Sequence, residues 1–419
     1  MAEHFHFGGC DTVALAREFG TPLYVVSEDD MLARMREVKA AFDDKYERAK
    51  THYASKAFLT KDMIRLAASE DLGLDVVSGG ELHGAMALGF PPERIVFHGN
   101  GKTPEEIATG LDYGVGRFVC DSVGEIELLN RLAGERGATA KILIRVTPGV
   151  DSHTHAYIST GQADSKFGVP LSVLLDALDV CGRMERVDLM GFHFHIGSQL
   201  LENSSHLLAV GILLSVIDGA RATCGFVTRE LNLGGGFGVH YTSNDKAPPI
   251  GHFIDPMVEK IESYCAERGL NRPDLSIEPG RWIVAEAGVT LYSVVSVKEI
   301  PGVRSYASVD GGLPDNPRPA LYQAEYDAVV ANKYDRKATE TMTIAGRCCE
   351  TGDILIRDLR VPPIKPGDVL AVKSTGAYCH SMASNYNKLP FPAVVALRGG
   401  VPRVSVRRQT YDELYERDA

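Results

Sequence analysis

One lysine stands where the chain could react with a carbonyl compound. Lys56 lies in the segment YASKAF, directly after a short β-rich run, and most of its neighbours are apolar. Desolvation by such neighbours would lower the pKa of the amine and favour its attack on an aldehyde. A surface lysine at the end of a strand would give the same pattern, so the position alone assigns no role.

Glycines follow a later β-rich run, in GGGFG (234–238). Gly235 and Gly236 lack a Cβ atom, so backbone N–H groups there could closely approach an anion. The loops after the last two strands of a TIM barrel commonly bind phosphate. A tight turn is the alternative interpretation.

The segment EPGR (278–281) ends the last run of this series. Glu278 could accept a hydrogen bond from the protonated ring nitrogen of a pyridine cofactor, and Arg281 could bind a carboxylate through two hydrogen bonds. Gly280 lies between them. A structural ion pair is the alternative interpretation.

Two histidines stand close together in HFHIGSQ (193–199). His193 and His195 share one face because side chains alternate along a strand. An imidazole there could stack on a cofactor ring, and Ser198 could donate a hydrogen bond to a phosphate. Histidines packed in a barrel wall would give the same pattern.

Two segments nearer the C-terminus complete the set of candidates. RCCETGD (347–353) joins two thiols to two acids, so a carboxylate could hold a substrate ammonium while a thiol moves a proton. GAYCHSMASNYN (376–387) is rich in small and aromatic residues that could line a site. Inert buried cysteines and a surface loop are the alternatives.

The first two thirds of the chain alternate short β-rich runs with amphipathic segments, which is typical of βα units around a parallel sheet. Eight runs predict a TIM (β/α)8 barrel, whose active sites lie at the C-terminal ends of the strands. An open doubly wound sheet is the alternative, although no GxGxxG follows the first run. The expected strands span 51–55, 74–77, 94–98, 117–120, 141–146, 189–195, 229–234 and 275–278, and the expected helices lie near 61–70, 80–88, 104–112, 123–136, 171–183, 204–224 and 254–269.

After about residue 288 the pattern changes to strand-like runs joined by Gly and Pro turns, which predicts an all-β domain. The early run PLYVVS (22–27) could pair with these strands, because chain ends often lie close together. We therefore expect a barrel domain over residues 28–282 and a β-rich domain formed by residues 1–27 and 283–419.

Composition narrows the classes of partner. The 44 basic and 55 acidic residues give a net charge of −11 without a dense Lys/Arg run, which argues against a nucleic-acid partner. No apolar run approaches the ~18 residues of a membrane span, and the first residues do not form a secretory signal pattern. Eight cysteines without a CxxC motif indicate reduced thiols. We expect a cytoplasmic protein that acts on a small molecule and binds neither a membrane nor a metal.

The order of the motifs resembles the fold-type III pyridoxal-phosphate-dependent decarboxylases, and most closely the diaminopimelate decarboxylases. The resemblance covers nearly the whole chain and rests on YASKAF, DVVSGGE, HGN, HFHIGSQ, LGGGFG, EPGR, SVDGG, CETGD and GAY. It implies an alanine-racemase-like architecture that carries pyridoxal 5′-phosphate. The implied reaction is decarboxylation of meso-2,6-diaminopimelate to L-lysine and CO2, the last step of lysine biosynthesis.

The resemblance also implies roles for residues around the cofactor. Lys56 would hold pyridoxal phosphate as a Schiff base, His195 would stack on its ring and Glu278 would pair with its ring nitrogen. Gly236, Ser198 and Tyr378 would bind its phosphate. The implied cofactor-binding residues are Lys56, His195, Ser198, Gly235, Gly236, Glu278, Gly280, Arg281 and Tyr378.

A substrate with two carboxylates needs a cation for the one that is not lost. Arg318 and Tyr322, in PRPALY, match residues of the diaminopimelate decarboxylases, and Glu350 could take the distal ammonium. The implied substrate-binding residues are Arg281, Arg318, Tyr322, Glu350 and Tyr378.

The resemblance implies a head-to-tail homodimer, in which CETGD reaches the barrel of the partner chain and each active site is built from two chains. Cys349 would then protonate Cα. We choose Cys349 over Cys348 because it directly precedes Glu350, as in the family pattern.

Three other functions remain open. A decarboxylase of ornithine, lysine, arginine or a specialised-pathway amino acid is opposed only by Arg318 and Tyr322. An amino-acid racemase, which uses a tyrosine as the opposing base, is opposed by CETGD. A non-catalytic cofactor-binding regulator should have lost Lys56 or Cys349, and both are present.

Overall fold

The chain folds as two units, and the computed structural model describes residues 3–150 and 165–419. We call them the barrel unit and the β unit, and each is described by itself. The barrel unit comprises Met35–Gly238 and Ala247–Gly280, and the β unit comprises Met1–Arg34, Val239–Lys246 and Arg281–Ala419.

Eight parallel strands close into a barrel, because β8 pairs with β10 as well as with β7. This confirms the expected TIM barrel and excludes the open doubly wound sheet. A short additional strand, β9 (Val169–Pro170), pairs with the end of β8. The barrel strands are β4 (Ala49–Ala54), β5 (Gly73–Val76), β6 (Ile95–Phe97), β7 (Arg117–Cys120), β8 (Ala140–Thr147), β10 (Val187–His193), β11 (Glu230–Asn232) and β12 (Asp274–Ile277).

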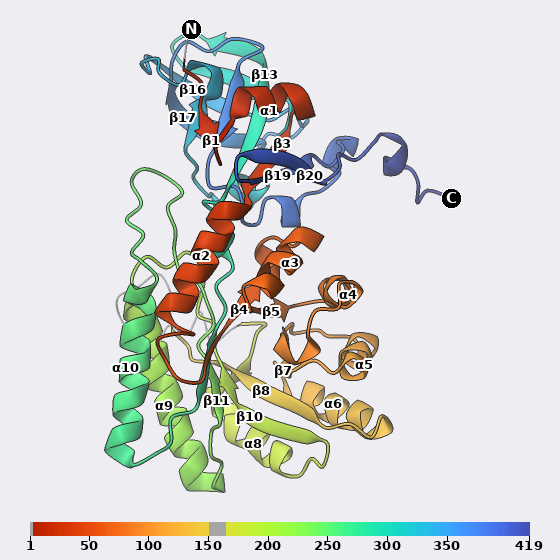
Figure 1. The fold of residues 1–419 in the computed structure, drawn as a ribbon, viewed down its shortest axis with the longest axis vertical. Helices are drawn as coiled ribbons and strands as arrows, with labels where there is room; N and C mark the ends of the chain where they lie inside the picture. The colour runs from red at the N-terminus through yellow and green to blue at the C-terminus, as the bar shows by residue number, and fades with distance from the viewer. Residues whose placement is uncertain (1–2, 151–164) are drawn as a thin grey trace. The chain divides into compact units, whose positions relative to one another are not determined.

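Helices lie outside these strands (Figure 1). Four of them begin after a Ser or Thr whose side chain accepts a hydrogen bond from the first turn, namely Thr60, Ser78, Thr103 and Ser122. These caps fix where each of the four helices begins. The helices are α3 (Lys61–Ser69), α4 (Gly79–Ala87), α5 (Pro104–Tyr113), α6 (Val123–Glu135), α8 (Leu174–Gly182), α9 (Ser204–Cys224) and α10 (Gly251–Arg268).

Helix α9 is long and apolar enough, by length and composition, to cross a membrane. One face of it packs in the barrel unit, where His206, Leu213 and Ile217 are buried. Core helices of water-soluble proteins satisfy the same criterion, so α9 is weak evidence for a membrane span.

The two ends of the barrel interior carry different polar groups. At the N-terminal end, Arg117 of β7 and Glu230 of β11 form an ion pair through two hydrogen bonds. Toward the C-terminal ends of the strands, buried polar side chains gather around Glu278. Arg117 and Glu230 neutralise each other. The polar groups around Glu278 lie at the end of the barrel where TIM barrels carry their active sites.

The β unit is built on a mixed sheet in the order β17-β16-β14-β13-β3-β19-β20. Its strand β3 (Leu23–Ser27), from PLYVVS, pairs antiparallel with β13 and parallel with β19, as expected. Strand β18 pairs with both β13 and β15. The other strands are β1 (His6–Phe7), β2 (Cys10–Asp11), β13 (Gly288–Ile300), β14 (Arg304–Val309), β15 (Ala328–Val330), β16 (Glu340–Ala345), β17 (Ile354–Val361), β18 (Val369–Val372), β19 (Ala393–Arg398) and β20 (Val401–Val406).

Four helices occur in or enter the β unit. Asp11 caps the first by accepting hydrogen bonds from the backbone N–H groups of Val13 and Ala14. The helices are α1 (Thr12–Phe19), α2 (Glu28–Ala41), α11 (Arg281–Val284) and α12 (Arg318–Tyr322).

Strand β10 contains a bulge that depends on glycine. Its register against β8 shifts between Leu189 and Gly191, and a Cβ atom on Gly191 would lie 1.9 Å from the carbonyl oxygen of Glu230 in β11. Glycine therefore allows β10 and β11 to approach one another at this point.

We predict that Gly191→Ala destabilises the protein by about 1–3 kcal/mol, because the added methyl group forces the strands apart. The measurement is the thermal unfolding midpoint, which should fall. The matched control is Gly219→Ala in α9, where a Cβ atom would meet nothing within 4 Å. An equal fall in both variants would contradict the packing argument.

Candidate functional site

Lys56 lies in a single turn of 3₁₀ helix, Ser55–Ala57, directly after β4. Gly280 lies against this turn, since a Cβ atom on Gly280 would be 2.9 Å from Ala54 Cβ and 3.1 Å from Ala57 Cβ. The side chain of Lys56 is exposed. The expected desolvation of this lysine by apolar neighbours is therefore wrong, although the residue does stand at the C-terminal end of the first barrel strand.

Glu278 is the centre of the buried polar groups and is 6% exposed. Its Oε1 accepts a hydrogen bond of 2.6 Å from Asn232 Nδ2, and His98 Nε2 lies 2.6 Å from the same oxygen. Its Oε2 lies 3.1 Å from His193 Nε2. Three side chains from three strand ends thus converge on one carboxylate.

These neighbours decide the charge of Glu278. Burial alone would raise the pKa of this carboxyl, but the imidazoles of His98 and His193 outweigh burial and hold its pKa well below the ordinary value. Burial also lowers the pKa of His193 to about 4. The arrangement we infer is an ionised Glu278 that accepts a hydrogen bond from a neutral His193.

His195 is oriented by the segment GGGFG (234–238), which we call the glycine loop. The backbone N–H of Gly235 donates a 3.2 Å hydrogen bond to His195 Nδ1. Burial, followed by the charges of Lys56 and Arg145, lowers the pKa of His195 well below its ordinary value. The imidazole is therefore neutral and can pack against an aromatic ring without carrying a charge.

The segments that contain Ser198 and Gly236 lie side by side. Leu200 donates a 2.9 Å backbone hydrogen bond to Gly236 and accepts one of 2.8 Å from Gly238. Gly236 has φ +97°, and a Cβ atom there would lie 2.4 Å from the carbonyl oxygen of Gly197. Only glycine fits this close approach.

Two further acids feel the charge of Lys56. Burial raises the pKa of both Asp75 and Glu81, to about 7 for Glu81, while Lys56 acts in the opposite direction on each. Glu81, from the segment DVVSGGE, also accepts a 2.7 Å hydrogen bond from the backbone N–H of Val77. Lys56 therefore extends into an acidic part of the barrel mouth.

The barrel unit fits a pyridine cofactor with an aldehyde and a phosphate. Glu278 is a buried anion suited to a protonated ring nitrogen, and Lys56 supplies an exposed amine. The glycine loop forms a cradle that a side chain would fill.

A second group of candidates lies in the β unit. Arg281 opens α11, and its guanidinium carbon is 4.8 Å from the ring centroid of Tyr378 and 5.5 Å from that of Tyr241. Tyr378 adopts φ +62°, which is unusual for a residue with a large side chain. Arg318, in α12, lies 4.9 Å over the same Tyr241 ring. The structure thus brings Arg281, Arg318 and Tyr378 together around Tyr241.

The other candidates of the β unit are exposed. Tyr322 is 63% exposed, and Cys349 and Glu350 are exposed as well. Asp353 holds this segment by accepting a 2.8 Å hydrogen bond from the backbone N–H of Cys348. Burial and the nearby Asp353 raise the pKa of the Cys348 thiol to about 12. Of the two thiols, Cys349 is the more accessible for proton transfer.

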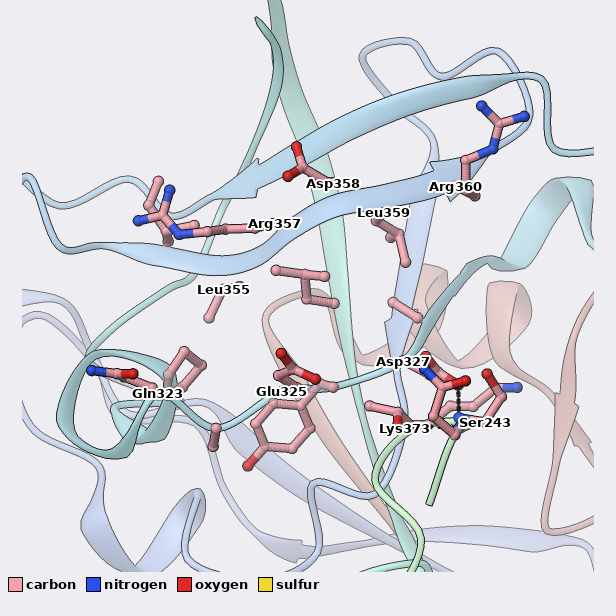
Figure 2. Close-up of a pocket in the computed structure, with 18 of the residues that line it drawn as sticks. Ser243, Gln323, Glu325, Asp327, Leu355, Arg357, Asp358, Leu359, Arg360 and Lys373 are labelled. Atoms are coloured by element: carbon pink, nitrogen blue, oxygen red, sulfur yellow. Dashed lines mark hydrogen bonds between the residues drawn. The ribbon is translucent and has the colours of Figure 1, made fainter. Parts of the chain in front are cut away.

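A hollow of about 1020 Å³ lies between β17 and the segment 323–329 of the β unit. Figure 2 shows Arg357 and Arg360 on one side, and Glu325 and Asp327 on the other. Each side carries both cations and carboxylates, with Asp358 beside the arginines and Lys373 beside the acids, so the lining favours neither an anion nor a metal ion. Its lining includes Gly352 of CETGD.

Comparison with known proteins decides the family. The model of the family described as "Pyridoxal-dependent decarboxylase, pyridoxal binding domain" matches residues 28–285. The diaminopimelate decarboxylase of Bacillus subtilis (strain 168) is 46% identical over 417 residues, which is 99% of this chain and 95% of the relative. The chain belongs to the diaminopimelate decarboxylase family. It is accordingly a carboxy-lyase that depends on pyridoxal phosphate.

Two other members of the family agree. The diaminopimelate decarboxylase of Bacillus methanolicus is 44% identical and is covered to 94%, with 97% of this chain aligned. The crystal structure of the M. jannaschii diaminopimelate decarboxylase in complex with L-lysine has a TM-score of 0.93 and 34% identity, with 99% of this chain and 96% of that chain covered. The barrel and β-rich architecture is therefore that of the fold-type III decarboxylases.

Reasoning from the sequence missed several residues of this decarboxylase. His98 lies in the quoted motif HGN but had no role, and Asn232 precedes the glycine loop by two residues. Alternation along a strand could have found Asn232, because it places Asn232 and Gly234 on one face. Tyr241 and Tyr326 belong to no strand-end motif, so no local signal indicated them.

Another buried histidine contacts the glycine loop of this decarboxylase. His206 of α9 stacks on Phe237 with ring centroids 5.4 Å apart, and its Nε2 lies 3.2 Å from the carbonyl oxygen of Gly235. Burial lowers the pKa of His206 to about 4. The folded chain therefore keeps this imidazole neutral at pH values where the unfolded chain protonates it.

We predict that His206→Phe flattens the pH dependence of stability between pH 6.5 and 4. In this window the unfolded state binds a proton that the folded state rejects, so stability falls as the pH falls, by about 1.4 kcal/mol per unit for one such group. The measurement is thermal unfolding of the apoprotein across the window. His83→Asn, on the exposed face of α4, is the matched control, and an equal flattening there would refute the assignment.

Proposed function

We propose that this chain decarboxylates meso-2,6-diaminopimelate to L-lysine and CO2, the last step of lysine biosynthesis, with Lys56 as the lysine that holds the cofactor. The observation that carries the residue assignment is the buried Glu278 carboxylate, which His98, His193 and Asn232 surround. A buried anion of this kind suits the protonated nitrogen of a pyridine ring.

Pyridoxal phosphate supplies an electron sink when the bond between Cα and the carboxylate breaks. With the cofactor bound, Glu278 would stay ionised and hold the proton on the ring nitrogen, which would preserve that sink. His195, held by the N–H of Gly235, would pack its neutral ring against the pyridine. Gly236 and Ser198, with Tyr378, would bind the phosphate.

Recognition of the substrate falls to residues of the β unit. Arg318 binds the carboxylate that is not lost, and Tyr322 contacts the same end of the substrate. Glu350 takes the distal ammonium, and Arg281 and Tyr378 complete the contacts. The support for Arg318 is that the residue is only 6% exposed and its guanidinium lies among tyrosines.

Cys349 delivers the proton to Cα. Its exposure makes its thiol accessible, whereas burial and Asp353 raise the pKa of Cys348 to about 12. A thiol with so high a pKa gives up its proton reluctantly, so Cys348 is the poorer donor.

We propose further that two copies form a head-to-tail homodimer and that Cys349 and Glu350 act in the active site of the partner. Residues that serve another chain must be accessible in their own, and both are exposed. All eight cysteines are free thiols, which suits a cytoplasmic enzyme.

We predict that the purified enzyme with pyridoxal phosphate releases CO2 from meso-diaminopimelate and forms L-lysine, but releases none from L-lysine, L-ornithine or L-arginine. Those three lack a distal carboxylate. Lys56→Ala should abolish both CO2 release and the visible absorbance of lysine-bound cofactor, because the amine that binds the aldehyde is gone.

Lys61→Ala, on the exposed start of α3, is the matched control for Lys56→Ala and should keep both signals. A retained cofactor band in Lys56→Ala would overturn the assignment of the lysine. Release from another amino acid alone would instead overturn the substrate and leave the lysine in place.

We predict that Lys56→Ala and Cys349→Ala, each inactive alone, regain activity when mixed. In a random mixture half of the dimers are mixed, and one of their two sites is intact, so about a quarter of wild-type activity should return. The measurement is CO2 release after the two variants have exchanged subunits.

Cys348→Ala is the control variant and should stay active without mixing. Failure of the mixture to recover, although the subunits have exchanged, would mean that Lys56 and Cys349 act in the same chain. Activity of Cys349→Ala on its own would mean that a different group donates the proton.

A further inference from the structure

Within the part of the chain that the structure describes, Arg318 is a buried cation without an acidic partner. It is 6% exposed and donates a hydrogen bond to the hydroxyl of Tyr326. Among residues 3–150 and 165–419, no Asp or Glu forms an ion pair with it; its guanidinium instead lies over the rings of Tyr241 and Tyr326, at 4.9 and 5.6 Å. A buried charge is costly unless it is paired, so this arrangement calls for an anion from outside the chain.

Tyr241 connects Arg318 to the second guanidinium. Arg281 donates a hydrogen bond to the hydroxyl of Tyr241, while Arg318 lies over the ring of the same residue. The rings of Tyr241 and Tyr326 are perpendicular, with centroids 5.3 Å apart. Each arginine therefore has a phenol oxygen as its acceptor, and the two phenols pack edge to face.

Phenols hold a substrate-binding guanidinium in place better than carboxylates do. A carboxylate partner would neutralise Arg318 and compete with an anionic substrate. Burial raises the pKa of both Tyr241 and Tyr326, so their hydroxyls stay neutral. They can fix the planes of the guanidiniums, and Tyr326 does so without neutralising the positive charge of Arg318.

We propose that Tyr241 and Tyr326 are positioning residues that hold the guanidiniums of Arg281 and Arg318 in place and thereby select a substrate with a second carboxylate. The inference rests on the proposed function, in which Arg318 binds the distal carboxylate. Neither tyrosine is assigned a contact with the reacting atoms.

The test compares Tyr326→Phe and Tyr241→Phe with wild type in steady-state decarboxylation of meso-diaminopimelate. Phenylalanine keeps each ring and removes only the acceptor oxygen, so both variants should fold. We expect the KM of Tyr326→Phe to rise about tenfold, the effect of losing one hydrogen bond to a charged group. Its kcat should change less than twofold, because the bond is made equally in the bound substrate and the transition state.

Tyr241→Phe should raise KM in the same direction, and Tyr241→Leu, which also removes the ring beneath both guanidiniums, should raise it further. The visible absorbance of bound cofactor should stay at its wild-type value in both phenylalanine variants, because neither tyrosine is assigned a contact with the cofactor. Tyr334→Phe is the matched control, because Tyr334 is 47% exposed and packs on Phe5. It should leave every constant unchanged.

Arg318→Met separates failure of this inference from failure of the proposed function. If Arg318→Met leaves KM unchanged, the distal carboxylate binds elsewhere, and both the proposed role of Arg318 and the inference are wrong. If Arg318→Met raises KM but neither phenylalanine variant does, the proposed function stands and the positioning role is overturned. If kcat, cofactor absorbance and the unfolding midpoint all fall in the phenylalanine variants, the tyrosines have only a structural role. That result would also overturn the positioning role.

Discussion

An ionised carboxylate inside a closed barrel is the constraint on which the chemistry of this decarboxylase depends. Leaving Glu278 charged and without partners would be very costly in that environment. His98, His193 and Asn232 remove most of the cost, since each places a polar nitrogen within 3.1 Å of the carboxylate. The barrel explains how they can meet: parallel strands bring residues that are distant in sequence to one end of the interior.

The β unit handles charge differently. Where the barrel keeps an anion and surrounds it with nitrogen atoms, the β unit keeps Arg318 and surrounds it with aromatic rings and phenol oxygens. Each group is a buried charge whose polar neighbours do not cancel it. The first suits a cationic ring nitrogen and the second suits a carboxylate.

The fold was predictable because its signals are local and repeated. Each barrel strand is a short β-rich run, and caps such as Thr103 with Glu106 mark where the next helix begins. The strand-end motifs around Lys56, His195 and Glu278 followed from the same pattern.

Other features depend on long-range packing. Tyr241 belongs to the short segment Val239–Lys246, which lies between two barrel stretches in the sequence but belongs to the β unit. The spacing of apolar residues along the chain does not indicate this change of unit. The exposure of Lys56 was not foreseen either, because apolar neighbours in sequence need not cover a side chain in space. The choice between Cys348 and Cys349 likewise needed the position of Asp353.

The assignment of Glu278 to the barrel unit and of Arg318 and Tyr326 to the β unit has an evolutionary consequence. Substitutions around Arg318 can change which end group of an amino acid is accepted while the residues that set the charge of the cofactor site stay as they are. A lineage of such enzymes could therefore diversify its substrates through one unit and conserve its chemistry in the other.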